Sequence, residues 1–427
     1  MDNTKNTSSQ LKRIPSSKHQ IDENKICHQA RFVIETLIEA NYQAYLVGGC
    51  VRDLVLGIEP KDFDVATDAH PEQICELFDN SRLIGRRFRI VHIYFKRNII
   101  EVSTFRASAN QNNQSSKKEH SGRIVRDNTF GTIEEDALRR DFTINALYYD
   151  IEKSEVLDYC SGYEDLLQRK ISMIGDVTTR YREDPVRLLR ALRFRAKLDL
   201  DIEKNTELPI KKLGPLLSDI PPARLFDEVI KLFHSGYAVK CFQELTRYQL
   251  LNILFPTTTQ ALKHDESFSL LIHTALENTD ARIANGKSVN PAFIFSILLW
   301  QPYLQLLKQS SKENIPFAEA SWSAGRSAVL DQSSVTSIPK RFSITICEIW
   351  KLQNRFKNKK GKKTLQLLEH PRFRAAYDFM CIREQSGDTN EENCDWWTHI
   401  QTLSNQEQRK IILSKPKKSR KRKMYHD

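Results

Sequence analysis

The feature of this sequence that most constrains its fold is a Gly-Gly pair set between a short apolar run and a helical pattern. The run AYLVGG covers residues 44–49, and the helical pattern begins at Val51. An apolar run that ends in glycines predicts a buried strand turning sharply into a helix. Because Gly48 and Gly49 have no side chain, their amides can approach phosphate oxygens at the positive end of that helix, and Arg52 adds a fork-shaped charge. An ordinary tight turn is the alternative explanation.

Two aspartates follow this turn in the segment DFDVATD, residues 62–68, whose alternation predicts a strand. Period two then places Asp62 and Asp64 on one face, with Cα atoms roughly 6.5 to 7 Å apart. Two carboxylates at about 6 Å repel by roughly 3 kcal/mol at an effective dielectric near 20, and a divalent ion removes that conflict. Mg²⁺ is the expected metal, and two ions there would suit in-line phosphoryl displacement. A pair of exposed strand acids is the alternative.

A third carboxylate and a second polar cluster extend this pattern. Glu101, on the second strand of a hairpin expected over 89–106, is either a further metal ligand or the partner of a nearby cation such as Arg106. Arg140, Asp141 and Asn145 bring together a cation, an anion and an amide, which suit phosphate, metal or water, and ribose. A helix cap or a surface ion pair explains any one of these three equally well.

A third polar cluster lies at the start of a strongly helical stretch. Pro185 at a first helical turn places Asp184 at the cap and Arg187 on the next turn, where its side chain could bond a base edge. A helix cap without any ligand is the alternative. The apolar stripe that follows, through Val186, Leu189 and Leu192, predicts the buried face of that helix.

Composition excludes several classes of protein. The chain has 427 residues, of which 40% are hydrophobic and 28% charged, so two to four folded units are expected at roughly 150 residues per domain. Its longest apolar stretch, Ala292–Trp300, is about half of a membrane span, and no apolar segment of a secretory signal precedes residue 20. We therefore expect a cytoplasmic protein without a membrane span. The eight cysteines form no CxxC pair, which favours reduced thiols.

The positive charge is concentrated in two segments. Residues 351–363 and 409–423 carry seven and nine Lys/Arg without an acid, while the formal net charge of the whole chain is only +11. This distribution predicts a mildly acidic globule with basic appendages that bind a polyanion, and nucleic acid is the leading partner. A solvated, disordered tail is the alternative for the last segment.

These patterns divide the chain into five parts. The fold class expected is α+β, with a mixed α/β head followed by an all-helical neck, body and C-terminal region. The expected parts are a disordered arm (1–21), a head (22–160) with a mobile loop (107–123), a neck (161–240), a body (241–400) and a basic tail (401–427).

Taken in order, GGCVRD, DFD, RRDFTINAL and EDPVRLLRALRF resemble the class II nucleotidyltransferases, the family of tRNA CCA-adding enzymes and bacterial poly(A) polymerases. The resemblance covers about residues 40–240. Within the family, the segments 83–93 (LIGRRFRIVHI) and 220–228 (IPPARLFDE) look like the poly(A) polymerase branch, and the basic C-terminal extension suits it. A CCA-adding or A-adding tRNA enzyme is the alternative.

The resemblance implies a polymerase β-like head, and a role for each motif. Asp62 and Asp64 would hold two Mg²⁺ ions, with Asp141 as a catalytic carboxylate and Glu101 as a further metal ligand. The expected nucleotide-binding residues are Gly48, Gly49, Arg52, Arg140, Asn145, Asp184 and Arg187, the last two for adenine. The implied activity is template-independent addition of AMP from ATP to RNA 3′ ends, which promotes RNA processing and decay. The basic tail would contact the RNA.

Overall fold

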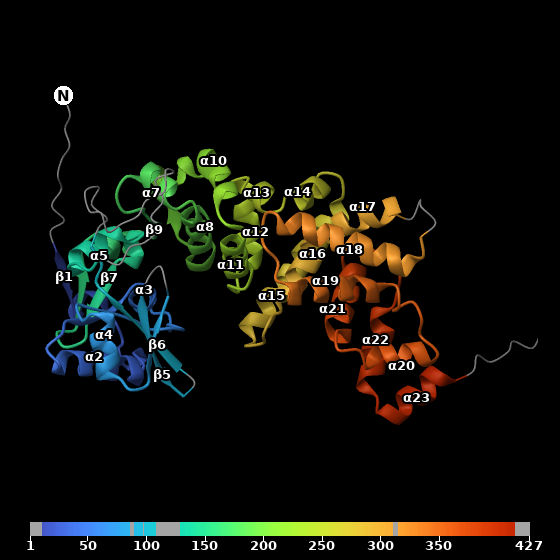
Figure 1. The fold of residues 1–427 in the computed structure, drawn as a ribbon, viewed down its shortest axis with the longest axis horizontal. Coiled ribbons are helices and arrows are strands. Elements are labelled where there is room, and N and C mark those ends of the chain that lie inside the picture. Colours follow the sequence, from blue (N-terminus) through green and yellow to red (C-terminus); the bar gives the residue numbers. More distant parts are fainter. Residues whose placement is uncertain (1–10, 86–88, 97, 108–128, 311–314, 415–427) are drawn as a thin grey trace, which may run out of the picture. The chain divides into compact units, whose positions relative to one another are not determined.

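The computed structural model describes residues 11–85, 89–96, 98–107, 129–310 and 315–414. The chain divides into two compact units, Met1–Leu217 and Ser218–Asp427. A mixed sheet with helices forms the first unit and helices form the second (Figure 1). The expected α+β class with a helical C-terminal region is therefore confirmed.

An eight-stranded sheet is the framework of the first unit, with strand order β1-β8-β7-β2-β3-β6-β5-β4. The β3–β6 pair is parallel and the other neighbours in this sheet are antiparallel. A separate parallel pair joins β9 and β10. The strands are β1 (Lys12–Pro15), β2 (Ala44–Val47), β3 (Asp64–Thr67), β4 (Ser81–Ile84), β5 (Ile90–Phe95), β6 (Asn98–Thr104), β7 (Leu147–Asp150), β8 (Glu155–Asp158), β9 (Lys170–Ile171) and β10 (Asp201–Ile202).

Two strand predictions can be compared with this sheet. The hairpin expected over 89–106 is confirmed as β5 and β6, and Arg97 in its turn lies outside the described residues. The strand expected over 62–68 begins only at Asp64. Its pairing with β6 starts at Asp64, which lies opposite Glu101, and its pairing with β2 starts at Val65, so neither neighbouring strand pairs with Asp62. Asp62 lies in the bend before β3, so the two aspartates do not share a strand face.

Helices cover the sheet and connect its strands. The amphipathic α2 packs on β2, β3 and β6, and α4 packs on β4 and β5. The helical segments up to residue 219 are α1 (Ser16–His19), η1 (Glu23–Lys25), α2 (His28–Glu39), α3 (Gly49–Val55), α4 (Pro71–Leu77), α5 (Ile133–Arg139), η2 (Thr143–Asn145), α6 (Gly162–Leu167), α7 (Val177–Glu183), α8 (Val186–Leu198), α9 (Lys204–Glu207), α10 (Pro209–Leu213) and η3 (Gly214–Asp219).

The disordered arm expected over 1–21 is wrong for residues 12–19. Lys12–Pro15 forms the edge strand β1, paired with β8 in the register Lys12 to Asp158. The buried ring of His19 lies 3.0 Å from the Ser154 carbonyl oxygen through Nε2. This polar segment is ordered because it pairs with β8. The partner lies about 140 residues later in the sequence, so local composition does not reveal it. Residues 1–10 and nearly all of the loop expected over 107–123 lie outside the described residues.

The second unit is a set of packed helices. A core around Trp397, Phe356 and Phe373 joins its last four helices. The helices are α11 (Pro222–Phe233), α12 (Ala238–Arg247), α13 (Leu251–Leu254), α14 (Pro256–Leu262), α15 (Glu266–Ala284), α16 (Pro291–Leu298), α17 (Trp300–Ser310), α18 (Phe317–Ser333), α19 (Lys340–Gln353), α20 (Lys362–Leu368), α21 (Phe373–Gln385), α22 (Cys394–Thr402) and α23 (Asn405–Leu413).

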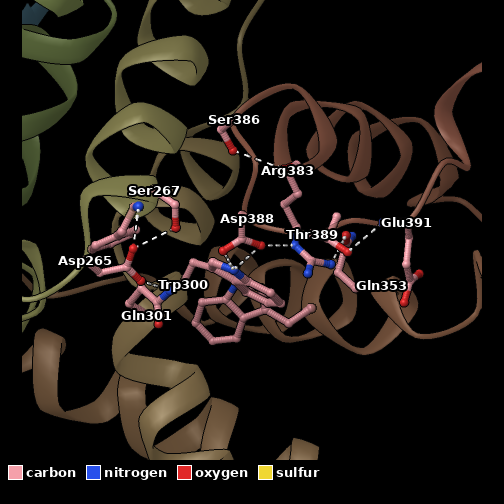
Figure 2. Close-up of polar contacts among 12 residues, drawn as sticks. Asp265, Ser267, Trp300, Gln301, Gln353, Arg383, Ser386, Asp388, Thr389 and Glu391 are labelled. Carbon is pink, nitrogen blue, oxygen red and sulfur yellow. Dashed lines mark hydrogen bonds and ion pairs between the residues drawn. The ribbon is translucent and has the colours of Figure 1, made fainter.

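A buried polar cluster fixes the connection between α21 and α22 (Figure 2). Asp388 accepts a 2.6 Å hydrogen bond from Arg383 Nε, and Trp300 Nε1 lies 3.2 Å from both of its carboxylate oxygens. The Arg383 guanidinium also lies 4.6 Å from the centre of a Trp300 ring. The Asp388 side chain is only 3% exposed and that of Arg383 17%, so this largely buried pair holds the connection against α17.

Two expectations about the second unit need correction. Cys381 and Cys394 are joined by a disulfide, so the expectation of eight reduced thiols is wrong for this pair. The basic segment 351–363 is not an appendage, because Phe356 is fully buried and accepts a hydrogen bond from Trp397 through its carbonyl. The tail expected from 401 is helical over Asn405–Leu413, and residues 415–427 lie outside the described part.

Among the described residues, no helix is both long enough and apolar enough to cross a membrane.

Candidate functional site

A cavity of about 410 Å³ in the first unit collects most of the residues selected from the sequence. It is formed by the Gly-Gly turn before α3, the start of β3, the segment between α5 and η2, and one face of α8. Its lining residues are Gly48, Gly49, Arg52, Asp64, Arg140, Asp141, Asn145, Arg190 and Phe194.

The backbone of Gly48 forms the turn that opens this cavity. Its φ is +77°, a conformation that favours glycine, and its amide donates to the Leu147 carbonyl at 3.0 Å. A Cβ at this position would lie 3.3 Å from Arg140 Nη1 and 3.6 Å from the Asn145 carbonyl oxygen. The missing side chain therefore allows the backbone to approach the Arg140 guanidinium closely.

Asp64 faces a second carboxylate across the sheet. The parallel register of β3 and β6 places it opposite Glu101. Burial raises the pKa of Asp64 to about 6, the Glu101 carboxylate adds to the rise, Arg140 opposes it, and Asp62 contributes a further rise. His92 approaches Glu101, with its Nε2 3.3 Å from Glu101 Oε1. Among the described residues, two carboxylates and one arginine act on the pKa of Asp64, so this partly buried acid is short of positive charge.

This shortage of positive charge is what a divalent cation would relieve. Asp62, Asp64 and Glu101 offer hard oxygen donors, which suit Mg²⁺. No three His, Cys, Asp or Glu side chains of the described residues form a ready metal cluster. Mg²⁺ does not require one, because it keeps several waters and binds through one or two carboxylates together with substrate phosphates. The donor set therefore fits the metal.

Arg140 is held in place by a buried carboxylate and a tyrosine. Asp136 Oδ2 accepts from Arg140 Nη2 at 2.9 Å and from the Tyr148 hydroxyl at 2.7 Å, and the guanidinium lies 5.3 Å from the Tyr148 ring centre. Burial alone would raise the pKa of Asp136, but the charge of Arg140 and the hydrogen bond from Tyr148 hold it below its usual range. The ionised Asp136 thus fixes Arg140 beside the Gly48 turn.

Asp141 also lines the cavity, where it binds an arginine. Its Oδ2 accepts from Arg190 Nε at 2.5 Å, and its Oδ1 accepts from the Phe142 amide at 2.8 Å and from Asn145 Nδ2 at 3.3 Å. Burial opposes ionisation, but the charge and hydrogen bond of Arg190 dominate, together with the other two bonds, and lower the pKa of Asp141 to about 2. Asp141 is therefore an ionised anchor that orients Arg190.

Arg52 forms another part of the cavity wall. Its Nη1 donates to Asn145 Oδ1 at 2.6 Å, while Nε and Nη2 donate to Asp53 Oδ1 at 2.8 and 2.6 Å. Its guanidinium carbon lies 5.3 Å from the centre of the Phe194 ring. These contacts make Arg52 a rigid cationic wall whose side chain is only 4% exposed.

Asp184 and Arg187 lie outside the lining of the cavity. Asp184 joins α7 to α8, and its Oδ1 accepts from the Val186 amide at 3.3 Å. Arg187 Nη1 donates to the Arg180 carbonyl at 2.6 Å and lies 3.4 Å from Glu183 Oε2. Arg187 precedes Arg190 by one turn of α8, so these two residues are next to the cavity rather than within it.

The structure thus brings together seven of the predicted residues and adds others. Asp62 and Glu101 lie beside Asp64 but do not line the cavity, as far as the described residues show. The sequence patterns assign no role in the site to Arg190, Phe194 or Asp136. For Arg190 the regular arginine spacing in RLLRALRF is a signal, but only the contact of Arg190 with Asp141, 49 positions earlier, shows its role.

Comparison with known families matches three regions of the chain. Residues 44–172 match the family described as Poly A polymerase head domain. Residues 199–262 match the one described as probable RNA and SrmB-binding site of polymerase A, and residues 313–426 the one described as polymerase A arginine-rich C-terminus.

Curated relatives match over most of the chain. It is 44% identical over 407 residues to Poly(A) polymerase I of Salmonella typhimurium, covering 93% of this chain and 88% of that protein. It is 42% identical over 419 residues to Poly(A) polymerase I of Haemophilus influenzae, covering 95% and 92%. A CCA-adding enzyme of Bacillus cytotoxicus is 35% identical over 222 residues, covering 52% of this chain and 54% of that protein.

Solved structures show a similar fold. The apo form II of a CCA-adding enzyme has a TM-score of 0.61 at 19% identity and covers 95% of this chain and 97% of its own. The Thermotoga maritima CCA-adding enzyme complexed with tRNA has a TM-score of 0.56 at 19% identity, covering 95% and 96%. At this identity the likeness concerns the fold alone.

Proposed function

The chain belongs to the bacterial poly(A) polymerase I family and is a polynucleotide adenylyltransferase, and we propose that the cavity between the Gly48 turn and α8 is where it adds AMP from ATP to RNA 3′ ends. The observation that carries this proposal is the convergence of the Gly48–Gly49 turn, the aspartate Asp64 with its raised pKa and three arginines on one cavity of about 410 Å³. Cationic and backbone donors suit a triphosphate, and the acid lies beside them.

Each residue has a distinct task in this reaction. The Gly48–Gly49 backbone and Arg140 bind the triphosphate, and the Asp141–Arg190 pair orients it. The RNA 3′-hydroxyl attacks the α-phosphorus and pyrophosphate leaves, without a covalent enzyme intermediate. Divalent ions bound at Asp62 and Asp64 would lower the pKa of the attacking hydroxyl and offset charge on the leaving group.

Adenine selection is proposed for Asp184 and Arg187. Without a template strand, the base has to be chosen by protein hydrogen bonds at a fixed geometry. Glu183 and the Arg180 carbonyl hold the Arg187 guanidinium one turn from the cavity, which supports this assignment. We further propose that the basic C-terminal tail, residues 401–427, contacts RNA phosphates, and that the cellular role is RNA processing and decay.

Incubation of a short unstructured RNA with each nucleotide separately tests the activity. A long ladder with ATP alone is expected, whereas addition that stops after one nucleotide on a tRNA, or that requires CTP, would instead indicate a CCA-adding or A-adding enzyme. The Asp64→Asn variant should lose about a thousandfold or more of the rate, since metal-assisted charge stabilisation contributes several kcal/mol. Asp79→Asn, the same change at an exposed site outside the cavity, is the control and should keep full activity.

A further inference from the structure

A second cavity, of about 620 Å³, lies entirely within the second unit. Its walls are the C-terminal part of α15, the connection from α15 to α16, one face of α19 and the length of α21. Its apolar lining includes the buried Ile349 and Ile382 and the partly buried Phe293. Its volume falls within the range of ligand-binding pockets, and none of the residues discussed above for nucleotide addition lines it.

The charge of this cavity is predominantly positive. Arg282, Lys287, Arg372 and Arg374 line it with the single acid Asp378, and Glu348, outside the lining, pairs with Arg372 at 3.1 Å. Burial raises the pKa of Asp378, while Arg374 and Arg282 oppose the rise, so both arginines lie close to this acid. The four cations come from the end of α15, the following connection and the start of α21, so more than one element supplies positive charge. This distribution suits several phosphates in a row better than one small anion.

Arg374 has the geometry of a stacking surface. Its Nη2 lies 3.0 Å from Asp378 Oδ1 and its Nε 3.3 Å from Oδ2, which fixes the plane of the guanidinium. One side of that plane lies over the Tyr377 ring, 5.1 Å from its centre, yet the side chain is 68% exposed. The solvent side can therefore stack on a nucleobase, as guanidinium planes do in single-stranded RNA recognition. Asn285 and Gln385 in the same lining offer amides for base edges.

We propose that this cavity binds a single-stranded segment of the RNA substrate, with Arg282, Lys287 and Arg372 contacting phosphates and Arg374 stacking on a base. The proposal rests on the proposed function in one respect, that the substrate of this chain is RNA. It adds a place, separate from the site of nucleotide addition, where the RNA is held mainly through its backbone and without sequence preference.

Binding of a fluorescently labelled 20-mer of adenylate to the full chain, measured by anisotropy from 0.05 to 0.5 M salt without ATP, tests the proposal. The double variant Arg282→Gln/Lys287→Gln should reduce the slope of log affinity against log salt by roughly 1.4, at about 0.7 for each phosphate that is no longer neutralised, which is about tenfold weaker binding at 0.15 M salt. The double variant Arg372→Gln/Arg374→Gln should reduce the slope by roughly 0.7, because Arg374 stacks on a base, and should weaken binding at 0.15 M salt by about fourfold from the lost phosphate contact, with the lost stacking in addition. Lys308→Gln/Arg326→Gln removes the same charge from exposed positions on α17 and α18 outside the cavity, and should leave slope and affinity unchanged.

Several results would overturn the proposal. Slopes of both cavity variants equal to that of the wild type would do so, as would an equal loss in the α17–α18 control, because the effect would then be general charge. Displacement of the labelled RNA from the wild type by millimolar inorganic phosphate as readily as by unlabelled RNA would assign the cavity to a small anion. Thermal unfolding of every variant shows whether a loss of RNA binding is caused by misfolding. If one of the two cavity double variants misfolds, RNA binding by the other tests the proposal.

Failure of the proposed function has a different outcome. A wild-type chain that binds the adenylate 20-mer but adds no nucleotide to it refutes the activity and leaves the cavity proposal intact. A wild-type chain that extends the RNA, with cavity variants that bind it normally, refutes the cavity alone. At saturating RNA the cavity variants should keep the wild-type rate of addition, because the residues around Asp64 are untouched.

Discussion

Replacing Asp64 by asparagine is expected to stabilise the metal-free first unit at pH 8 while abolishing nucleotide addition. The pKa of Asp64 is raised from 3.8 to about 6 by burial, by Glu101 and by Asp62, against the opposing charge of Arg140. A rise of about two units corresponds to about 3 kcal/mol, because each unit is worth about 1.4 kcal/mol. The folded wild type carries this penalty whenever the carboxyl is ionised, and an uncharged amide does not.

The sign of the pH dependence follows from the direction of the pKa shift. Between pH 4 and pH 6 the folded state binds more protons at Asp64 than the unfolded state, so the wild type loses stability as pH rises through this window. Above pH 6 the whole penalty is present, and below pH 4 it is absent. The stability gained by Asp64→Asn should therefore reach up to about 3 kcal/mol at pH 8 and vanish near pH 3.5.

Hydrogen exchange is the suitable assay, because all five tryptophans lie in residues 218–427 and their fluorescence reports on the second unit only. Protection of β3 and β6 should increase in Asp64→Asn at pH 8 with a chelator present, while tryptophan fluorescence unfolding stays unchanged. Added Mg²⁺ should protect the wild type and not the variant. A variant that is less protected than the wild type at pH 8, or a difference independent of pH, would refute the electrostatic reasoning.

Three further changes have definite expected results. Asp136→Asn should raise KM for ATP and lower kcat/KM by about tenfold, because Arg140 loses its ionised partner, and steady-state kinetics with ATP as the varied substrate checks this. Asp388→Ala should destabilise the second unit by about 3 kcal/mol in a tryptophan fluorescence titration, since it leaves a buried cation unpaired. Reduction of the Cys381–Cys394 disulfide, 13 positions apart, should cost about 3 kcal/mol in the same titration, and Cys381→Ser/Cys394→Ser should no longer respond to reductant.

Local sequence signals are sufficient for the strand, turn and helix that open the site. The apolar run before Gly48 and the stripe of α8 follow backbone periodicity, which any short window contains, and both elements appear where expected. The DFD segment predicts β3 but not its first residue, because the end of a strand is set by the partners available on β2 and β6.

Contacts between distant segments cannot be predicted in this way. Asp136 on α5 and Tyr148 on β7 hold Arg140 and are joined by a hydrogen bond, and Arg190 reaches Asp141 from a helix 49 positions later. The edge strand β1 resembles a disordered arm in its local composition for the same reason, since its partner β8 is distant. In the basic segment 351–363, burial of Phe356 outweighs the charge of its neighbours, which composition alone does not indicate.

A structure of the chain determined with Mg²⁺ and a non-reactive ATP analogue tests the central claim most directly. We expect electron density for a cation about 2.0 to 2.1 Å from carboxylate oxygens of Asp62 and Asp64, with the triphosphate against the Gly48–Gly49 backbone and Arg140. A nucleotide bound elsewhere, with Asp64 still facing Glu101 and no cation between them, would contradict the account.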